Sequence, residues 1–430
     1  MRRTAGRWVS TANLMPAVRW QIAILLCVIT TINYLDRQAL AVAGPVIVEE
    51  FTLSNTQFGA ITSAFLFAYA LGQIVVGPVI DRLGTKRAFS IAVIAWSIAG
   101  MLHAAARGFW GFFLFRTALG LTEAANFPAA LKSVAEWFPR SERSLAVGIV
   151  TVGPGLGAVL APPLLGWLIT SFGWQWAFIV PGAAGFVWLW IWRAWYDRPE
   201  VHAGLTDAER STILSGRDAG APQGSADAKT VFDFLRIREV WGLMLSRFVS
   251  DGAFYFFVAW LPLYLAQERG FDIRQIAFSA WIPFLAADIG SIAGGWLGTR
   301  LIKRGWSVNR SRKVLIWFAA LMVPCALPAV TVESAYVALG LIAVAMFAIQ
   351  FKAANLFSVP ADLFPARDVA TIWGLFGAVG SFGGMVFIAG VGWVSEHYGY
   401  APIFAAVALM HIVSALILNW LVPNIDQIER

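Results

Sequence analysis

The sequence predicts an all-α integral membrane protein with twelve membrane-spanning helices, arranged as two halves of six. Its composition is that of a membrane protein, because 59% of the 430 residues are hydrophobic and 13% are charged, with a mean hydropathy of +0.68. Soluble domains carry about 25% charged residues, so the composition excludes an ordinary soluble enzyme. Uncharged stretches long enough to cross the bilayer core as a helix, about 20 residues, occur at 144–192, 314–332, 369–395 and 398–425.

Twelve predicted spans account for the apolar part of the chain. Each is a mostly apolar run bounded by loops that carry charged residues, Gly or Pro. The spans are 18–40, 56–80, 88–107, 109–136, 144–170, 174–196, 240–267, 275–301, 314–332, 335–362, 369–394 and 399–421. The stretch 197–239 is polar and includes DAGAPQGSADAK, a composition typical of linkers. We therefore expect one six-helix bundle at 1–196, a linker at 197–239 and a second bundle at 240–430.

The basic residues predict the orientation of the spans. Of the 32 Lys and Arg residues, nearly all of those in loops fall on the side of the membrane that holds the N-terminus. The loops on the other side carry Arg107, Arg269 and Arg274. Cytoplasmic loops show such an excess of Lys and Arg, so we expect both termini in the cytoplasm. The basic charge then borders the membrane, which argues against a nucleic-acid partner.

The two halves of the sequence resemble each other. EWFPRSERSLAVG at 136–148 matches DLFPARDVATIWG at 362–374, and the same offset aligns GW at 166–167 with GW at 392–393. The aligned segments occupy corresponding positions in the two halves, which indicates duplication of a six-helix unit. In this layout the chain resembles the major facilitator superfamily, whose two parallel repeats enclose a site near the membrane midplane.

The loop between the second and third spans carries a short motif, GPVIDRLGTKR at 77–87. It resembles the signature loop of the same superfamily, Gly-x-x-x-Asp-Arg-x-Gly followed by basic residues. Gly77 allows close approach of helices, and Gly84 permits a tight turn. Asp81 can accept hydrogen bonds from a facing helix N-terminus, and Arg82 anchors the inner face. The resemblance implies a gating contact between the halves.

Four of the ionisable residues inside predicted spans stand out, because a charge there is costly and usually functional. Asp36 and Arg37 are adjacent in the first span, and Arg116 and Glu123 lie two turns apart on one face of the fourth. Arginine offers a permanently charged fork that fits a carboxylate, and a carboxyl group in a low dielectric can carry a proton near neutral pH. The pattern favours an anion site beside proton-carrying carboxylates. Two alternatives stay open: Asp36 reaches the outer surface with Arg37 as its partner, or Arg116 and Glu123 form a structural ion pair.

Several segments together resemble the anion:cation symporter family of this superfamily. They are NYLDR in the first span, FRTALGLTEAANFPA at 115–129, EWFPRSERSLAVG at 136–148 and RFVSDGAFYFFVAWLPLYL at 247–265. Within the family, AADIGSIAGGW at 286–296 and NLFSVPADLFP at 355–365 are most similar to the hexuronate and sugar-acid branch. The resemblance covers nearly the whole chain outside the linker and the termini.

The resemblance implies roles for individual residues. Arg37 and Arg116 would bind the substrate carboxylate, while Asp36 and Glu123 would be the protonatable pair. The other candidates for substrate contact are polar or aromatic residues in the spans: Tyr34, Tyr69, Gln73, Asn126, Tyr255, Trp260, Lys352 and Asn355. For Gln73 and Asn355, a structural contact between helices is an open alternative.

Lys352 departs from the pattern of sugar-acid relatives, which usually carry an uncharged residue at this place. If it faces the cavity, it could recognise a second anionic group and favour a dicarboxylate; otherwise it could neutralise Asp251 or Asp288. Arg247 and Asp251 are one turn apart in the seventh span, so we expect them to form an intrahelical ion pair.

The residues and the resemblance together predict a secondary active transporter. We expect proton-coupled symport of a small organic anion, above all a hexuronate such as glucuronate or galacturonate, by alternating access. Aldonates, aldarates, other dicarboxylates and aromatic acids are alternative substrates. We expect no enzyme, because the spans offer no nucleophile–base set or metal-ligand group, and no cofactor beyond a coupling proton. The expected setting is the lipid bilayer of a bacterial inner membrane, with the protein as a monomer.

Overall fold

The computed structural model describes residues 17–216, 231–364 and 366–426. Over these ranges the chain folds into helices and contains no β-strand. A helix satisfies its backbone hydrogen bonds internally, which the bilayer core requires. The predicted all-α class is therefore confirmed. Part of the predicted linker, 217–230, lies outside the described residues.

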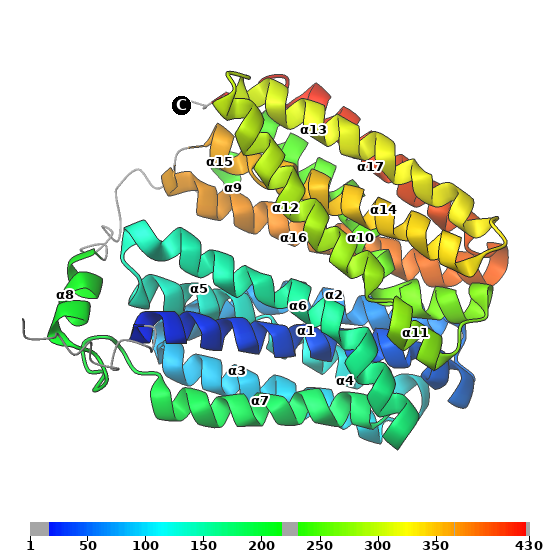
Figure 1. Ribbon diagram of the computed structural model, residues 1–430, viewed down its shortest axis with the longest axis horizontal. Coiled ribbons are helices and arrows are strands. Elements are labelled where there is room, and N and C mark those ends of the chain that lie inside the picture. The colour runs from blue at the N-terminus through cyan, green and yellow to red at the C-terminus, as the bar shows by residue number, and fades with distance from the viewer. Residues whose placement is uncertain (1–16, 217–230, 365, 427–430) are drawn as a thin grey trace, which may run out of the picture.

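Helices from the first half of the chain lie together in Figure 1, coloured blue to green. They are α1 (Val18–Glu50), α2 (Asn55–Leu83), α3 (Thr85–Leu102), the 3₁₀ turn η2 (His103–Ala105), α4 (Gly108–Glu123), α5 (Asn126–Trp137), α6 (Arg140–Phe172) and α7 (Trp176–Trp195). Within this group α1 packs on α6, α2 on α4, and α3 on α7.

Helices from the second half form the other side of the molecule (Figure 1). They are α10 (Arg238–Arg269), α11 (Ile273–Ser279), α12 (Ile282–Lys303), α13 (Val308–Met322), the 3₁₀ helix η3 (Val323–Val330), α14 (Ala335–Leu356), α15 (Val359–Leu363), α16 (Ala366–Tyr398) and α17 (Ala401–Leu421). Here α10 packs on α16 and α17, and α12 on α14. Two short helices, α8 (Asp207–Gly216) and α9 (Val231–Phe234), stand between the groups in sequence.

Three seams join the two groups: α2 with α16, α1 with α10, and α6 with α11 and α12. Within each group, small residues let helices approach closely, as membrane helices require. A Cβ atom on Gly120 of α4 would lie 2.4 Å from the Phe65 carbonyl oxygen of α2. A Cβ atom on Gly290 of α12 would lie 2.2 Å from the Phe347 carbonyl oxygen of α14. Backbone therefore packs directly on backbone at these crossings.

Prolines explain why several predicted spans are divided. A proline has no N–H for the carbonyl four residues earlier, so a helix tends to break there. α4 ends just before Ala124, four residues ahead of Pro128, and α11 ends at Ser279, four ahead of Pro283. Eleven helices in the described part of the chain are long and apolar enough to cross a membrane. The fourth predicted span, 109–136, which is divided into α4 and α5, is not among them.

The first predicted span ends too early. α1 continues through Pro45 to Glu50 and has 33 residues. Asp36 and Arg37 therefore lie near the middle of the helix and not near its end. Asp36 is 2% exposed, so the alternative in which it reaches the outer surface is wrong.

Candidate functional site

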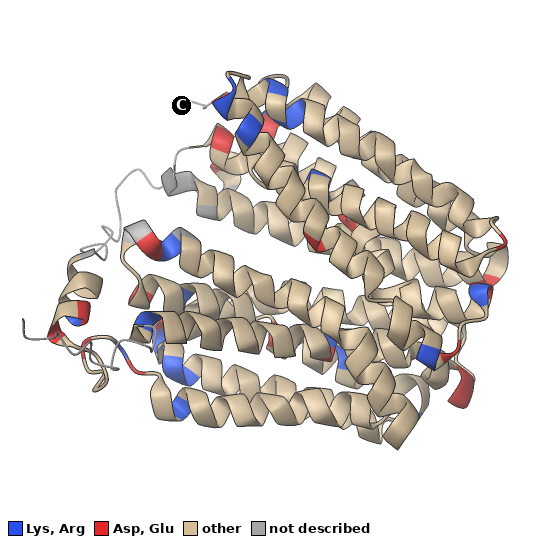
Figure 2. Cartoon of the chain, viewed as in Figure 1, with Lys and Arg blue, Asp and Glu red and all other residues tan. Residues whose placement is uncertain are grey.

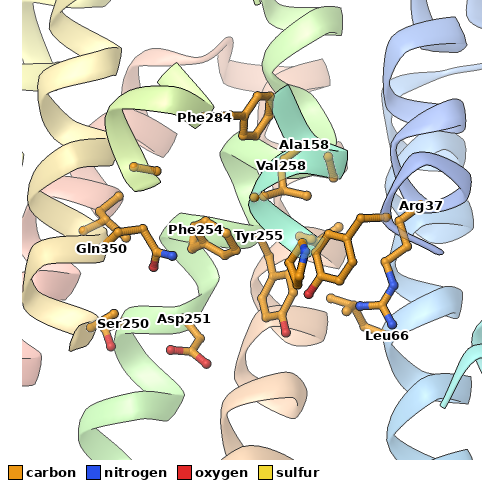
Figure 3. Close-up of a pocket in the computed structure, with 18 of the residues that line it drawn as sticks. Arg37, Leu66, Ala158, Ser250, Asp251, Phe254, Tyr255, Val258, Phe284 and Gln350 are labelled. Atoms are coloured by element: carbon orange, nitrogen blue, oxygen red, sulfur yellow. The ribbon is translucent and has the colours of Figure 1, made fainter. Parts of the chain in front are cut away.

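A cavity of about 290 Å³ lies between the two groups of helices. This volume is near the lower end of the range for small-molecule sites, ~300–1,000 Å³. Figure 3 shows Arg37 entering from one wall and Gln350 on the opposite wall, with Tyr255 between them. The polar lining residues are Tyr34, Arg37, Gln38, Thr62, Arg116, Arg247, Ser250, Asp251, Tyr255, Asp288, Gln350, Lys352 and His411.

Arg37 is the centre of the wall formed by the first group. Its Nε atom lies 2.7 Å from Oε2 of Glu123, a carboxylate that is fully buried. The guanidinium carbon lies 4.4 Å from the ring centroid of Tyr69 and 4.8 Å from that of Tyr34. Aromatic faces stabilise a cation at such distances. α1 thus presents to the cavity a cation whose carboxylate partner comes from α4.

Arg116 supports Arg37 from behind. One of its Nη atoms donates a hydrogen bond of 2.9 Å to the Arg37 carbonyl oxygen, so the two arginines lie at the same level of the bundle. Its Nε and other Nη atoms are buried and have no hydrogen-bond partner within the described residues. Glu123 forms its ion pair with Arg37 of a different helix and not with Arg116 on its own face. The second sequence-based alternative, an Arg116–Glu123 structural pair, is therefore not the arrangement found.

Further buried polar groups surround this pair. Both carboxylate oxygens of Asp36 and both side-chain polar atoms of Asn33 and Asn126 lack hydrogen-bond partners in the described part of the chain. Asp36 faces α3, where a Cβ atom on Gly100 would lie 3.3 Å from its Oδ1 atom. Buried polar groups are normally satisfied, so a cluster of unpartnered ones is unusual for a purely structural core. Asn33, one turn before Arg37, was missed by the sequence analysis.

The opposite wall carries its own ion pair. Arg247 Nε lies 2.7 Å from Asp251 Oδ2, so the predicted intrahelical pair is confirmed. The Arg247 guanidinium is held between the rings of Phe357 and Phe376, with 4.5 Å from its carbon to each ring centroid. Both ionic residues line the cavity, together with Tyr255 one turn beyond Asp251.

Lys352 lies on the same wall and is 1% exposed. Its Nζ atom donates to Ser414 Oγ at 2.6 Å and to the His411 carbonyl oxygen at 3.5 Å. Neither Asp251 nor Asp288 forms an ion pair with it, although the Asp251 carboxylate is near enough for the two charges to stabilise each other.

Five predicted contact residues are not among the residues that line the cavity. They are Tyr69, Gln73, Asn126, Trp260 and Asn355. Tyr69 is behind Arg37 and contacts its guanidinium. Trp260 packs edge-on against Phe58, with 5.2 Å between ring centroids, where α2 meets α10. Asn355 donates a hydrogen bond of 3.1 Å to the Phe351 carbonyl oxygen of its own helix and one of 3.1 Å to the Gly294 carbonyl oxygen of α12. The second bond is the inter-helix contact left open above.

The predicted gating loop has a defined geometry. Asp81, 74% exposed, forms an ion pair of 2.6 Å with Lys132 of α5. Gly84 has φ +76°, which suits glycine and the tight turn from α2 into α3. A Cβ atom on Gly77 would meet no atom within 4 Å, so the expected close approach is not present in this conformation. Arg82 is exposed.

Five polar lining residues were not singled out from the sequence: Gln38, Thr62, Ser250, Gln350 and His411. Each is a polar residue inside an apolar span, and that signal could have found them. Gln38 directly follows Arg37, and Gln350 lies two residues before Lys352. Their side chains bring neutral donors and acceptors to a cavity otherwise lined by charged and aromatic groups.

Comparison with known proteins identifies relatives along nearly the whole chain. Residues 26–358 match the sequence model of the Major Facilitator Superfamily. A hexuronate transporter of Escherichia coli (strain K12) is 36% identical over 96% of this chain and 96% of its own. A galacturonate transporter of Dickeya chrysanthemi is 38% identical over 71% of this chain and 89% of its own. A D-galactonate transporter of Escherichia coli O6:H1 is 32% identical over 95% of this chain and 97% of its own.

A solved structure shares the fold. It is a bacterial homologue of the human lysosomal transporter Spinster, in an inward-facing and unoccupied conformation. It is 20% identical, with a TM-score of 0.73 over 95% of this chain and 96% of its own. At this identity the likeness bears on the fold alone.

Proposed function

This chain belongs to the major facilitator superfamily, and on that premise we propose that it is a secondary transporter that carries a sugar acid across a membrane together with a proton. The substrate we propose first is a hexuronate, glucuronate or galacturonate. The relatives support this class, because proteins named as hexuronate and galacturonate transporters are 36% and 38% identical to the chain. The observation that carries the proposal is the buried Arg37–Glu123 pair at the cavity wall.

The pair makes Arg37 a switchable anion receptor. A carboxylate ligand takes two N–H groups of a guanidinium fork, whereas Glu123 holds the Nε atom of Arg37 and one Nη atom has no partner among the described residues. A substrate carboxylate therefore competes with Glu123 for the same cation. While Glu123 is ionised it occupies Arg37, and when a proton neutralises Glu123 the fork becomes available.

Coupling follows from the cost of an unpaired buried charge. Removing one member of a buried ion pair leaves the other uncompensated, which costs roughly 3–5 kcal/mol. Arg37 thus requires one anion at all times, either ionised Glu123 or the substrate. Proton uptake and substrate binding favour each other, and loss of one favours loss of the other. Asp36, buried and unpartnered beside the same helix, is the second carboxyl group proposed to carry a proton.

Contacts between the two groups support a state that is closed at one end. At the end opposite α8, the side-chain amides of Asn55 and Gln267 exchange hydrogen bonds of 3.3 and 3.0 Å. Nearby, the Thr56 N–H donates to Glu396 Oε2 at 2.9 Å. A Cβ atom on Gly392 of α16 would lie 2.5 Å from the Asn55 carbonyl oxygen. We infer that this end is the outer gate, and that rocking of the two groups opens it.

The proposal includes the layout within the membrane. We propose twelve spans in two six-helix repeats, with α4 and α5 together forming the fourth span, bundles at 1–196 and 240–430, and the linker 197–239 between them. Figure 2 shows Lys and Arg gathered at the end that carries α8, which supports cytoplasmic termini by the positive-inside rule. We propose a bacterial inner membrane as the location and a monomer as the working unit.

Uptake into proteoliposomes tests the function. Purified protein is reconstituted, and uptake of radiolabelled glucuronate and galacturonate is measured with and without an inward proton gradient. We expect accumulation above equilibrium only with the gradient. Uptake that ignores the gradient would refute proton symport and leave a facilitator or exchanger. If neither hexuronate enters, the first alternatives are aldonates, aldarates and aromatic acids.

A further inference from the structure

The wall of the cavity opposite Arg37 holds a second cationic group that the proposed coupling does not use. We propose that Lys352 is the centre of a second anion subsite, and that the cavity accepts six-carbon sugar diacids (aldarates) with one carboxylate at Arg37 and the other at Lys352. This inference rests on the proposed function and extends it from hexuronates to diacids. It starts from the unusual surroundings of the Lys352 ammonium group.

Lys352 is buried without a countercharge in contact. Its Nζ atom donates to two neutral oxygens, Ser414 Oγ and the His411 carbonyl. Within the described ranges, no carboxylate oxygen lies within 4.0 Å of it. An ammonium group has three N–H donors, so one is left for a ligand. A buried charge with only neutral partners is costly, and a bound carboxylate would remove that cost.

The carboxylates on this wall have other neighbours. Asp251 is held by Arg247 at 2.7 Å. Asp288 lies against α6 of the other group, where a Cβ atom on Gly155 would be 2.5 Å from its Oδ2 atom. Neither carboxylate forms an ion pair with Lys352. The wall therefore presents Lys352 to the cavity as a cation available to an incoming anion.

Further donors lie around Lys352. One Nη atom of Arg247 is buried and has no hydrogen-bond partner in the part of the chain described. Both ring nitrogens of His411 are likewise buried and unpartnered, and the residue lines the cavity. Three residues with spare donors on one wall can satisfy the several lone pairs of a carboxylate. They come from α10, α14 and α17, so the subsite belongs wholly to the second group of helices.

The arrangement matches a ligand with acidic groups at both ends. Arg37 comes from α1 and Lys352 from α14, and both line the cavity. Figure 3 shows Arg37 on one side of the cavity and Gln350, which is also on α14, on the other. A hexuronate has a single carboxylate, so when it binds Arg37 it offers only hydroxyl groups to the far wall. A diacid such as galactarate or glucarate places a second carboxylate there and neutralises the buried ammonium.

Competition and binding measurements with a neutral variant test the subsite. Wild type, Lys352→Met and Lys352→Arg are compared in proteoliposomes by inhibition of labelled glucuronate uptake with unlabelled galactarate, glucarate and galacturonate. Lys303→Met is the matched control, because Lys303 is exposed at the end of α12 and does not line the cavity. In parallel, galactarate and galacturonate are tested for stabilisation of the detergent-solubilised proteins against heat, a readout that needs no transport.

We expect both diacids to inhibit wild type and Lys303→Met alike. In Lys352→Met, the galactarate concentration that gives half-inhibition should rise by at least about tenfold, because one charge-assisted contact is lost. The half-inhibitory concentration of galacturonate should change by less than about threefold. Lys352→Arg should keep diacid inhibition. The subsite would be refuted if Lys352→Met weakened inhibition by galactarate and by galacturonate equally. It would also be refuted if no diacid inhibited uptake by the wild type or stabilised it against heat. Neither outcome would contradict hexuronate transport. If wild type takes up no hexuronate, the proposed function fails, and heat stabilisation by galactarate alone still decides the subsite.

Discussion

Glu123→Gln isolates the competition between a proton and the substrate for Arg37. The change keeps the shape of the side chain and removes its charge, so Arg37 loses its ionic partner at every pH. In wild type, substrate binding should require protonation of Glu123, and the bound state then holds one proton more than the free state. The dissociation constant therefore rises with pH once the free protein has lost that proton.

The structure sets the size of the effect. One carboxylate, Glu123, forms an ion pair with Arg37 within the described residues, so one proton should be linked to binding. One linked proton corresponds to a tenfold change in Kd per pH unit, or about 1.4 kcal/mol. Between pH 7 and 9 the wild-type Kd for glucuronate should thus rise by up to about 100-fold. The variant should bind tightly throughout and change by no more than about threefold.

Titration of intrinsic tryptophan fluorescence with glucuronate, in detergent between pH 5.5 and 9, measures these values. Glu49→Gln is the matched control, because Glu49 is exposed at the end of α1, away from the cavity. It should follow wild type. If Glu123→Gln keeps the wild-type slope, Glu123 is not the group that competes with substrate, and the coupling argument fails.

Three other substitutions follow from single contacts. Arg37→Lys should weaken glucuronate binding at pH 6 by at least about tenfold, since an ammonium group cannot offer the guanidinium fork; unchanged affinity would remove Arg37 from the site. Gly392→Val should hold the outer gate open, because a Cβ atom at this position would lie 2.5 Å from the Asn55 carbonyl oxygen. A cysteine introduced as a reporter by Gln267→Cys should then react faster with a membrane-impermeant thiol reagent. An unchanged reaction rate would contradict the assignment of this end as a gate. Gly120→Ala should lower stability by about 1–3 kcal/mol, because its Cβ would be 2.4 Å from the Phe65 carbonyl oxygen. The midpoint of thermal unfolding measures that loss. Gly340→Ala, whose Cβ would meet no atom within 4 Å, should not lower the midpoint.

The membrane class and most of the helices could be predicted from the sequence, because both follow from local composition. Long apolar runs without charge require helices in a bilayer, and the described residues form eleven helices that are long and apolar enough to cross one. The main errors concern helix ends. α1 runs on to Glu50 because the residues after Arg37 are again apolar, and the fourth span breaks ahead of Pro128. The missing N–H of Pro128 accounts for that break.

The sequence by itself also singled out Asp36, Arg37, Arg116 and Glu123 as candidate site residues, because charge inside an apolar span is a local and costly feature. Only the tertiary structure decided which of these groups meet. Glu123 pairs with Arg37, 86 positions away on another helix, and not with Arg116 on its own face. Lys352 is held by Ser414 and not by either nearby aspartate. The physical reason is that hydropathy sets which segments are buried, whereas the rotation and crossing of packed helices set which side chains face one another.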